Sequence, residues 1–216
     1  HDNYFLGAKV YGVAEERKVR ILKEAGYNAI RTSHNPMSSE LLEACDKYGM
    51  LVVNEAFDMW STKKTAQDYH LYFNEWWKKD LTTFIKRDRN HPSVIMWSTG
   101  NEIPNRDKPE VVAISQMLTD FVHSMDSTRA VTCGVNGVGP DKDPFFATLD
   151  VGGYNYNPQL YAIDAKRVPN RIIYGSESFV KKSFQYWRGV LDHPQVIRDF
   201  VWGVWDYIVE VSIAWC

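Results

Sequence analysis

Two glutamates each follow an apolar stretch of the chain, and their carboxyl groups could act as an acid or a nucleophile. Glu102 comes directly after residues 94–101, which read VIMWSTGN, and Glu177 comes after residues 172–176, which read IIYGS. A carboxylate just past a buried strand faces either a site or a cation, so an ion pair with Arg31 is the structural alternative for one glutamate alone. Two glutamates on separate strands weaken that alternative. Two carboxylates across a polar pocket suit hydrolysis of a glycosidic bond, in which one is the nucleophile and the other the proton donor.

Polar and aromatic residues also follow the other apolar stretches of the chain. These segments are RTSHN at 31–35, NEAFD at 54–58, GNE at 100–102, YNY at 154–156, SES at 176–178 and WDY at 205–207. Functional groups at the carboxyl ends of many strands are typical of barrel enzymes. No glycine-rich GxGxxG or GxxxxGK segment follows a predicted strand, which disfavours the nucleotide-binding forms of a parallel sheet.

The elements that position these residues alternate between strand and helix. Apolar runs predict strands at 28–32, 51–55, 93–97, 130–133, 149–152, 171–174 and 200–203. Helical spacing predicts helices at 15–25, 38–48, 71–88, 109–125 and 179–191. Continuous apolar strands that alternate with helices indicate an α/β fold with a parallel sheet covered by helices, either an open doubly wound sheet or a closed barrel.

The polar strand ends favour the closed form, so we expect a (β/α)8 TIM barrel. The sequence predicts seven strands rather than eight. We therefore expect a barrel truncated at both ends, with the first strand mostly before His1 and the last helix after Cys216. Such a barrel exposes two unpaired strand edges and loses precision at its site, so we expect residues 1–216 alone to be inactive or a poor catalyst.

Composition sets limits on the class of protein and on its partners. The 216 residues are 44% hydrophobic and 24% charged, which is enough apolar material for a sizeable core. The formal net charge is −2, so neither nucleic acid nor a membrane is expected as a partner. Cys45, Cys133 and Cys216 lie far apart, which argues against a disulfide framework and against a zinc site. The compartment stays open, whether cytoplasmic, periplasmic or secreted.

Two motifs resemble those of a known family. Residues 30–36 read IRTSHNP, and residues 87–102 read RDRNHPSVIMWSTGNE. Both stretches resemble motifs of glycoside hydrolase family two, which contains the β-galactosidases, β-glucuronidases and β-mannosidases. The second stretch closely resembles the acid/base signature of that family. The resemblance covers essentially all of residues 1–216. It implies a partial catalytic TIM barrel, preceded by β-sandwich domains in a longer protein.

The resemblance also implies a role for each residue that matches the family's pattern. Glu102 matches the acid/base and Glu177 the nucleophile of a retaining, double-displacement mechanism, for which the two carboxyl groups would lie about 5–5.5 Å apart. Arg31 matches an arginine beside the nucleophile. Tyr156 matches the tyrosine that hydrogen-bonds the nucleophile, with Tyr154 as the alternative for that role.

Further residues match positions that contact the sugar. The expected substrate-binding residues are His1, Asp2, His34, Asp58, Asn101, Trp202 and Trp205. Asn101 matches the contact to the sugar 2-hydroxyl, and either Trp202 or Trp205 would stack on the apolar face of the ring.

Some relatives hold magnesium through a glutamate, a histidine and the acid/base. This chain has Asp58 and Trp60 where that glutamate and histidine would be. Magnesium prefers oxygen ligands and an indole offers none, so we expect neither a metal nor any other cofactor.

The first functional hypothesis is a retaining β-glycosidase that acts on terminal β-galactosides. The alternatives within the family are a β-glucuronidase and a β-mannosidase. From other classes come a carbohydrate-binding barrel that has lost catalysis, which the presence of Glu102 and Glu177 disfavours, and an unrelated parallel-sheet enzyme. The expected partner is a carbohydrate substrate, and oligomerisation through the full-length protein stays open.

Overall fold

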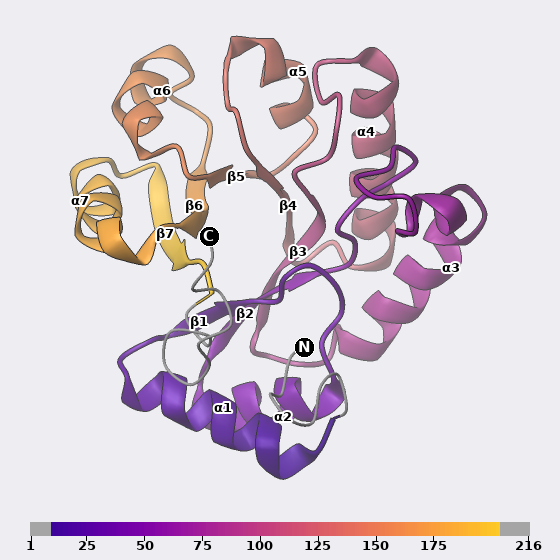
Figure 1. The fold of residues 1–216 in the computed structure, drawn as a ribbon, viewed down its shortest axis with the longest axis vertical. Helices are drawn as coiled ribbons and strands as arrows, with labels where there is room; N and C mark the ends of the chain where they lie inside the picture. Colours follow the sequence, from indigo (N-terminus) through magenta and orange to yellow (C-terminus); the bar gives the residue numbers. More distant parts are fainter. Residues whose placement is uncertain (1–9, 204–216) are drawn as a thin grey trace.

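Seven parallel strands form a nearly closed barrel in the computed structural model, which describes residues 10–203. The strands are β1 (Ala29–Arg31), β2 (Leu51–Glu55), β3 (Val94–Asn101), β4 (Ala130–Val135), β5 (Val151–Asn155), β6 (Ile173–Ser178) and β7 (Val196–Val201). Each strand pairs in parallel with the next along the chain, in the order β1 to β7. Figure 1 shows this ring of strands face on. The predicted α/β fold class and TIM barrel are therefore confirmed, as is the number of strands.

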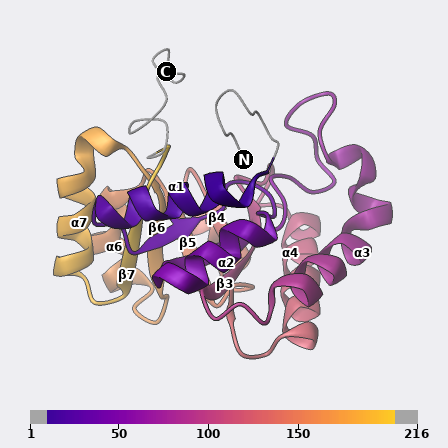
Figure 2. The same cartoon turned by 90° about the horizontal axis from the view of Figure 1, so that it is seen from below.

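Helices surround the ring on its outside (Figure 1). They are α1 (Gly12–Glu24), α2 (Ser39–Tyr48), α3 (His70–Asp88), α4 (Pro109–Met125), α5 (Asp143–Phe146), α6 (Tyr161–Arg167) and α7 (Ser183–Asp192). Short 3-10 turns at Pro140–Lys142, Pro158–Leu160 and Val180–Lys182 precede α5, α6 and α7. Figure 2, seen from below, shows α1 and α2 side by side in front of the strands. No helix among residues 10–203 is long and apolar enough to cross a membrane.

Local signals explain where α2 begins and ends. The Ser38 hydroxyl accepts a hydrogen bond from the Leu41 amide at 3.2 Å, which satisfies one of the free N–H groups of the first turn. Gly49 ends the helix at φ 65°, a left-handed conformation that glycine adopts without a steric penalty. These are the residues at which the sequence predicts the start and end of this helix.

Other elements differ from their predicted bounds. The helices α5 and α6 have 4 and 7 residues, too few to show a helical period, and the sequence did not predict them. Strand β3 continues to Asn101, beyond the predicted 93–97, because its polar residues after Trp97 are buried within the barrel. Strand β7 begins at Val196 rather than at residue 200, because Arg198 and Asp199 interrupt its apolar pattern.

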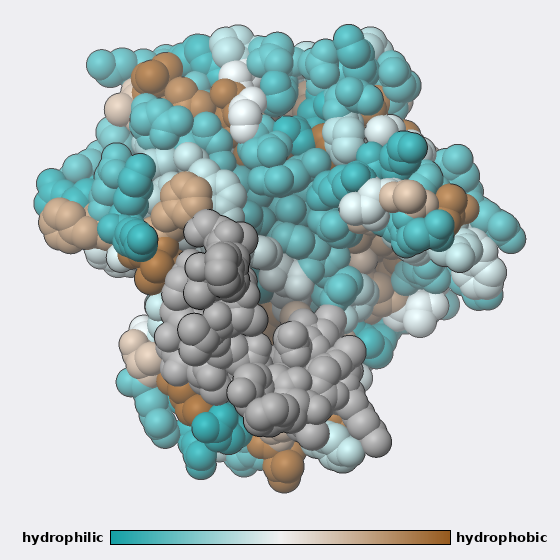
Figure 3. Space-filling model, viewed as in Figure 1, coloured by the Kyte–Doolittle hydropathy of each residue, from teal (hydrophilic) through white to brown (hydrophobic). Residues whose placement is uncertain are grey.

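A layer of apolar side chains lies beneath the polar strand ends. This buried cluster consists of Val53, Met96, Val151, Tyr174 and Phe200, from five different strands. Val53 and Glu55 are two positions apart on β2, so both side chains point to the same face. Strand β2 therefore contributes both to this apolar layer and, through Glu55, an acidic side chain to the end of the barrel. In Figure 3 the middle of this face is largely hydrophilic where described atoms are visible.

The two ends of the strand order face each other across a cavity. Residues of β1 and β7 line this cavity, which has a volume of about 840 Å³. Two of the predicted site residues, Arg31 and Trp202, lie at its border. His1, Asp2 and Trp205, which the sequence also predicts at the site, lie outside the described residues.

Candidate active site

Arg31 is the centre of a polar network that joins four strands. It is the last residue of β1, and its side chain is only 3% exposed. Its guanidinium donates to Glu55 on β2 at 2.7 Å, to Asn101 on β3 at 2.9 Å and to Glu177 on β6 at 2.9 Å. The three partners lie 24, 70 and 146 residues away along the chain. The barrel is therefore what brings these groups to one place.

Glu55 is a fully buried carboxylate that sequence reasoning did not assign to the site. His34 Nδ1 lies 2.7 Å from its Oε1, and the Ser98 hydroxyl donates to its Oε2 at 2.5 Å. Burial by itself would raise the pKa of Glu55, but the charge of Arg31 and the bonds from His34 and Ser98 hold that pKa below its ordinary value. Glu55 follows the apolar residues LVV and one asparagine. Glu102 and Glu177 likewise come at the end of an apolar stretch, so the same pattern could have indicated Glu55.

Glu177 lies beside a positive charge and a phenol. It is 3% exposed, and its Oε1 accepts from Arg31 Nη1 at 2.9 Å. The Tyr156 backbone N–H donates to the Glu177 carbonyl at 2.9 Å, and burial together with the charge of the Glu177 carboxylate raises the pKa of Tyr156 above its ordinary value. The alternative residue, Tyr154, instead donates to Asp164 at 2.7 Å. The structure thus places Tyr156, and not Tyr154, on Glu177.

Glu102 follows the last residue of β3 and is held by a neutral group. Among the described residues its carboxylate accepts one hydrogen bond, from Asn155 Nδ2 at 3.0 Å. The same nitrogen donates to Asn101 Oδ1 at 3.0 Å, and the Ser176 hydroxyl donates to Asn155 Oδ1 at 2.5 Å. Asn155 therefore connects Glu102 to β6. It lies in the YNY segment at 154–156, but the sequence did not predict it as a site residue.

The two predicted catalytic glutamates both lie near the end of β5, at Asn155 and Tyr156. Asn155, the neighbour of Tyr156 in the chain, pairs with Glu177 in the register of β5 and β6 and also contacts Glu102. Burial, and then the charges of Glu177 and Glu102, raise the pKa of Tyr156. The structure thus brings the two glutamates to the same polar site at the carboxyl ends of the strands.

Two of the residues expected to contact sugar lie against each other. The rings of His34 and Trp202 are stacked, with centroids 5.0 Å apart and planes 10° from parallel. The peptide bond between Ser33 and His34 is cis. His34 Nε2 lies 3.3 Å from Asn101 Nδ2 and 3.6 Å from Glu177 Oε1. His34, Trp202 and Asn101 therefore line one side of the site beside Glu177.

Asp58 and Trp60 do not form a metal site. Lys64 Nζ lies 2.6 Å from Asp58 Oδ1, so an ammonium group already balances that carboxylate. The indole N–H of Trp60 donates to the Thr99 carbonyl at 2.9 Å, and the ring is 1% exposed. Residues 10–203 contain no group of three or more His, Cys, Asp or Glu side chains that could hold a metal ion. The surroundings of Asp58 and Trp60 therefore do not fit a magnesium ion, and no step of the proposed chemistry passes through a metal.

Comparison with known proteins gives consistent matches across the barrel. Residues 3–198 match the family model described as "Glycosyl hydrolases family 2, TIM barrel domain". The chain is 44% identical to "Beta-galactosidase BoGH2A" of Bacteroides ovatus over 95% of its own length, and 34% identical to a beta-glucuronidase of Mus musculus over 89%. A crystal structure of a family 2 member from Bacteroides cellulosilyticus matches 94% of the chain with a TM-score of 0.92 and 56% identity. The chain spans 28%, 35% and 26% of these three relatives.

Proposed function

The chain belongs to glycosyl hydrolase family 2 as a β-glycosidase domain, and from this premise we propose that it hydrolyses terminal β-glycosides with retention of configuration. In this proposal Glu177 is the nucleophile and Glu102 is the general acid and base. The proposal concerns the full-length protein that carries the domain, with a carbohydrate as its substrate and without a cofactor.

The difference between the surroundings of the two glutamates carries this proposal. A nucleophilic carboxylate has to be ionised when it attacks, and Glu177 lies 2.9 Å from the guanidinium of Arg31. A general acid has to carry a proton, and the one hydrogen bond that residues 10–203 make to the Glu102 carboxylate comes from the neutral amide of Asn155. The charge distribution supports these roles and disfavours their exchange. The same distribution of charge disfavours a carbohydrate-binding barrel without catalysis, because Glu177 has Arg31 as its partner and Glu102 has Asn155.

The proposed reaction has two steps. In the first, a Glu177 oxygen attacks the anomeric carbon while Glu102 gives its proton to the leaving oxygen, which forms a covalent glycosyl-enzyme. In the second, Glu102 takes a proton from water, the water oxygen attacks the anomeric carbon, and the bond to Glu177 breaks. Arg31 holds Glu177 in place through its hydrogen bond, and Tyr156 lies beside it, with its backbone N–H on the Glu177 carbonyl. Asn101, fixed by Arg31 and Asn155, is placed to contact the sugar 2-hydroxyl.

We propose a β-galactoside as the substrate. The support is the 44% identity to a relative named as a beta-galactosidase over 95% of this chain. A β-glucuronide is the second candidate, because another relative named as a beta-glucuronidase is 34% identical over 89% of the chain. A β-mannoside is the third. A panel of chromogenic β-glycosides given to the full-length protein separates the three by the sugar that is released fastest.

Substitution of the two glutamates tests the mechanism. Glu177→Gln is expected to lower kcat/KM by about 10⁴-fold or more for every substrate, because the step that forms the covalent bond is lost. Glu102→Gln is expected to lower kcat/KM by about 10² to 10⁴-fold for alkyl glycosides, which need a proton on the leaving oxygen. Activated dinitrophenyl glycosides, whose leaving groups need none, are expected to be affected much less.

The exposed Glu110 on α4 provides a matched control for these substitutions. Glu110→Gln is expected to leave every substrate at the native rate. Turnover close to the native value in Glu177→Gln, or an equal loss on both kinds of leaving group in Glu102→Gln, would contradict the assignments.

A further inference from the structure

The backbone at Glu102 has a conformation that needs support from its surroundings. Its φ is 43°, in the left-handed region that residues with a side chain rarely adopt. Such a residue persists only where neighbouring groups fix it. The Glu102 amide is held by a hydrogen bond to the Gly134 carbonyl at 2.8 Å. The direction of its side chain then depends on the peptide groups on either side.

A lysine binds the peptide group before Glu102. Lys64, in the loop between β2 and α3, donates from Nζ to the Asn101 carbonyl at 2.8 Å and to Asp58 Oδ1 at 2.6 Å. Its side chain is 23% exposed. The loop is itself ordered around Asp68, which accepts from the backbone amides of Lys64 and Thr65 at 2.8 and 2.6 Å. The ammonium group is therefore delivered from a structured turn and is balanced by a carboxylate.

An arginine binds the carbonyl of Ile103, the residue after Glu102. Arg106, which is 8% exposed, donates from Nη1 to the Ile103 carbonyl. Its Nη2 donates to the Asn136 carbonyl at 2.8 Å and also to the Asn136 side chain. Among the described residues, the hydrogen bonds of this buried guanidinium go to carbonyl oxygens and not to a carboxylate. It thus joins the Glu102 loop to the end of β4.

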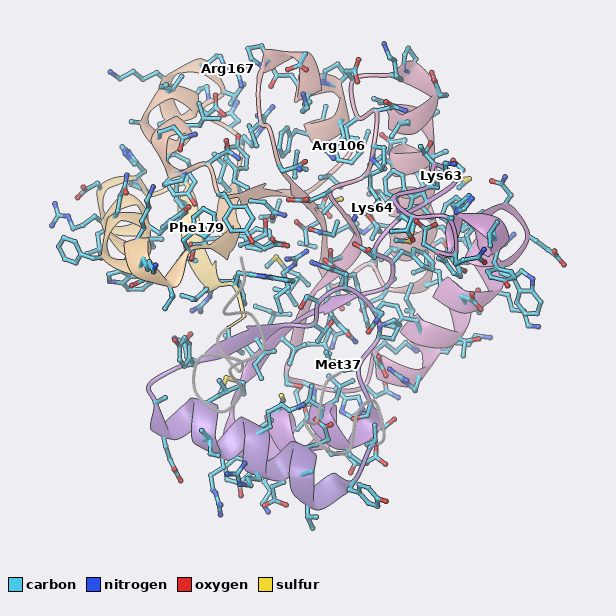
Figure 4. The ribbon with its side chains drawn as sticks, in the orientation of Figure 1. Met37, Lys63, Lys64, Arg106, Arg167 and Phe179 are labelled. Atoms are coloured by element: carbon cyan, nitrogen blue, oxygen red, sulfur yellow. The ribbon has the colours of Figure 1, made fainter. Side chains whose placement is uncertain are left out.

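We propose that Lys64 and Arg106 are positioning residues that clamp the acid/base Glu102 from its two sides. One cation binds the carbonyl of the residue before Glu102, and the other binds the carbonyl of the residue after it. In Figure 4, Lys64 and Arg106 lie towards the ring near the end of β3, whereas Lys63 lies farther out. Asp58 serves this clamp by holding Lys64. The inference rests on the proposed acid/base role of Glu102.

The test compares leaving groups in the full-length protein. A clamp that aims Glu102 matters most where the leaving oxygen needs a proton, since a small misplacement of a reacting group is costly. Lys64→Met is therefore expected to lower kcat/KM about tenfold for alkyl glycosides and less than about twofold for dinitrophenyl glycosides. Lys64→Arg, which keeps a cation, should recover most of the loss. Lys63→Met, at the exposed neighbouring position, is the matched control and should match the native protein.

Arg106→Lys is the second arm, and it should show the same dependence on the leaving group as Lys64→Met. If the Arg106 variant does not fold, the Lys64 series alone decides. An equal loss on both kinds of substrate, or no loss in Lys64→Met, would overturn the clamp while the proposed function stands. The Glu102→Gln panel separates the two failures, because absence of its leaving-group dependence would overturn the proposed function and the clamp together.

Discussion

Two carboxylates in the barrel wall have pKa values shifted in opposite directions, although burial acts in the same direction on both. Glu55 on β2 is fully buried, yet its pKa lies below the ordinary value because Arg31, His34 and Ser98 bind it. Asp199 on β7 accepts one hydrogen bond from the Ser178 hydroxyl at 2.8 Å, and its shielded Oδ1 has no partner among the described residues. Burial raises the pKa of Asp199 to about 6. Loss of solvent alone therefore does not decide the charge of a group in this barrel.

The difference lies in where the fold places its counter-charges. Around Glu55 and Glu177, Arg31 supplies several donors to carboxylates that would otherwise repel each other. Near Asp199, the nearby hydroxyl of Tyr161 is also buried and without a partner among residues 10–203. The candidate active site is thus the region where buried charge is compensated. On β7, burial destabilises the ionised form of the Asp199 carboxyl.

The largest effect on stability is expected from Glu55→Gln. The change removes one of the two carboxylates that balance Arg31 and turns an amide N–H₂ towards donors. Breaking a buried ion pair in this way typically costs about 3–5 kcal/mol, and we expect a loss of that order in the free energy of unfolding at pH 7. Urea unfolding of the full-length protein measures it. A change of less than about 0.5 kcal/mol, the size of an ordinary surface effect, would show that Glu55 is not a paired buried charge.

A smaller effect of opposite sign is expected from Asp199→Asn. The folded-state pKa of about 6 lies above the reference value of 3.8, so the folded protein holds this proton more tightly than the unfolded chain. The stability that comes from the protonated group is complete below pH 4 and is lost as the pH rises through 6. The asparagine should therefore raise the free energy of unfolding on the order of 2 kcal/mol at pH 8 and give no gain at pH 4.

The comparison between these two variants is itself a control. Both replace a carboxyl by an amide at a position within the barrel wall. Equal destabilisation by Glu55→Gln and Asp199→Asn at pH 8 would mean that the two carboxyls are in equivalent surroundings. That result would remove the contrast between the two regions.

The smallest effect is expected from removal of divalent cations. Lys64 already balances Asp58, and the Trp60 N–H donates to a carbonyl, so a chelator should change turnover by less than about twofold. Assays of the full-length protein with and without chelator measure this. A large loss that magnesium restores would reveal a site built from other ligands.

Local patterns in the sequence predict much of the fold and part of the site. The bounds of α2 follow from Ser38 and Gly49, and the glutamates at strand ends follow from apolar runs that deliver them to the rim. The role of Glu55 could not be predicted in this way, because Arg31 reaches it from another strand and shares it with Glu177. The sugar contact of Asp58 stays a prediction. In the structure its carboxylate is paired with Lys64, a lysine that the sequence alone does not distinguish from ordinary surface. Which side chains pair across the barrel depends on the register of the strands and on the paths of the loops. No single segment of the sequence specifies either of these.

The central claim is that Glu177, the carboxylate beside Arg31, forms a covalent bond to the sugar. The most direct test is to incubate the full-length protein with the dinitrophenyl 2-deoxy-2-fluoro-β-glycoside of the sugar that it hydrolyses, and to locate the adduct by peptide mass spectrometry. The fluorine slows both formation and breakdown of the intermediate, whereas the activated leaving group speeds its formation alone, so the covalent species should accumulate. One adduct is expected, on the peptide that contains Glu177, and none in Glu177→Gln. An adduct on Glu102 or Glu55, or inverted stereochemistry of the product, would contradict it.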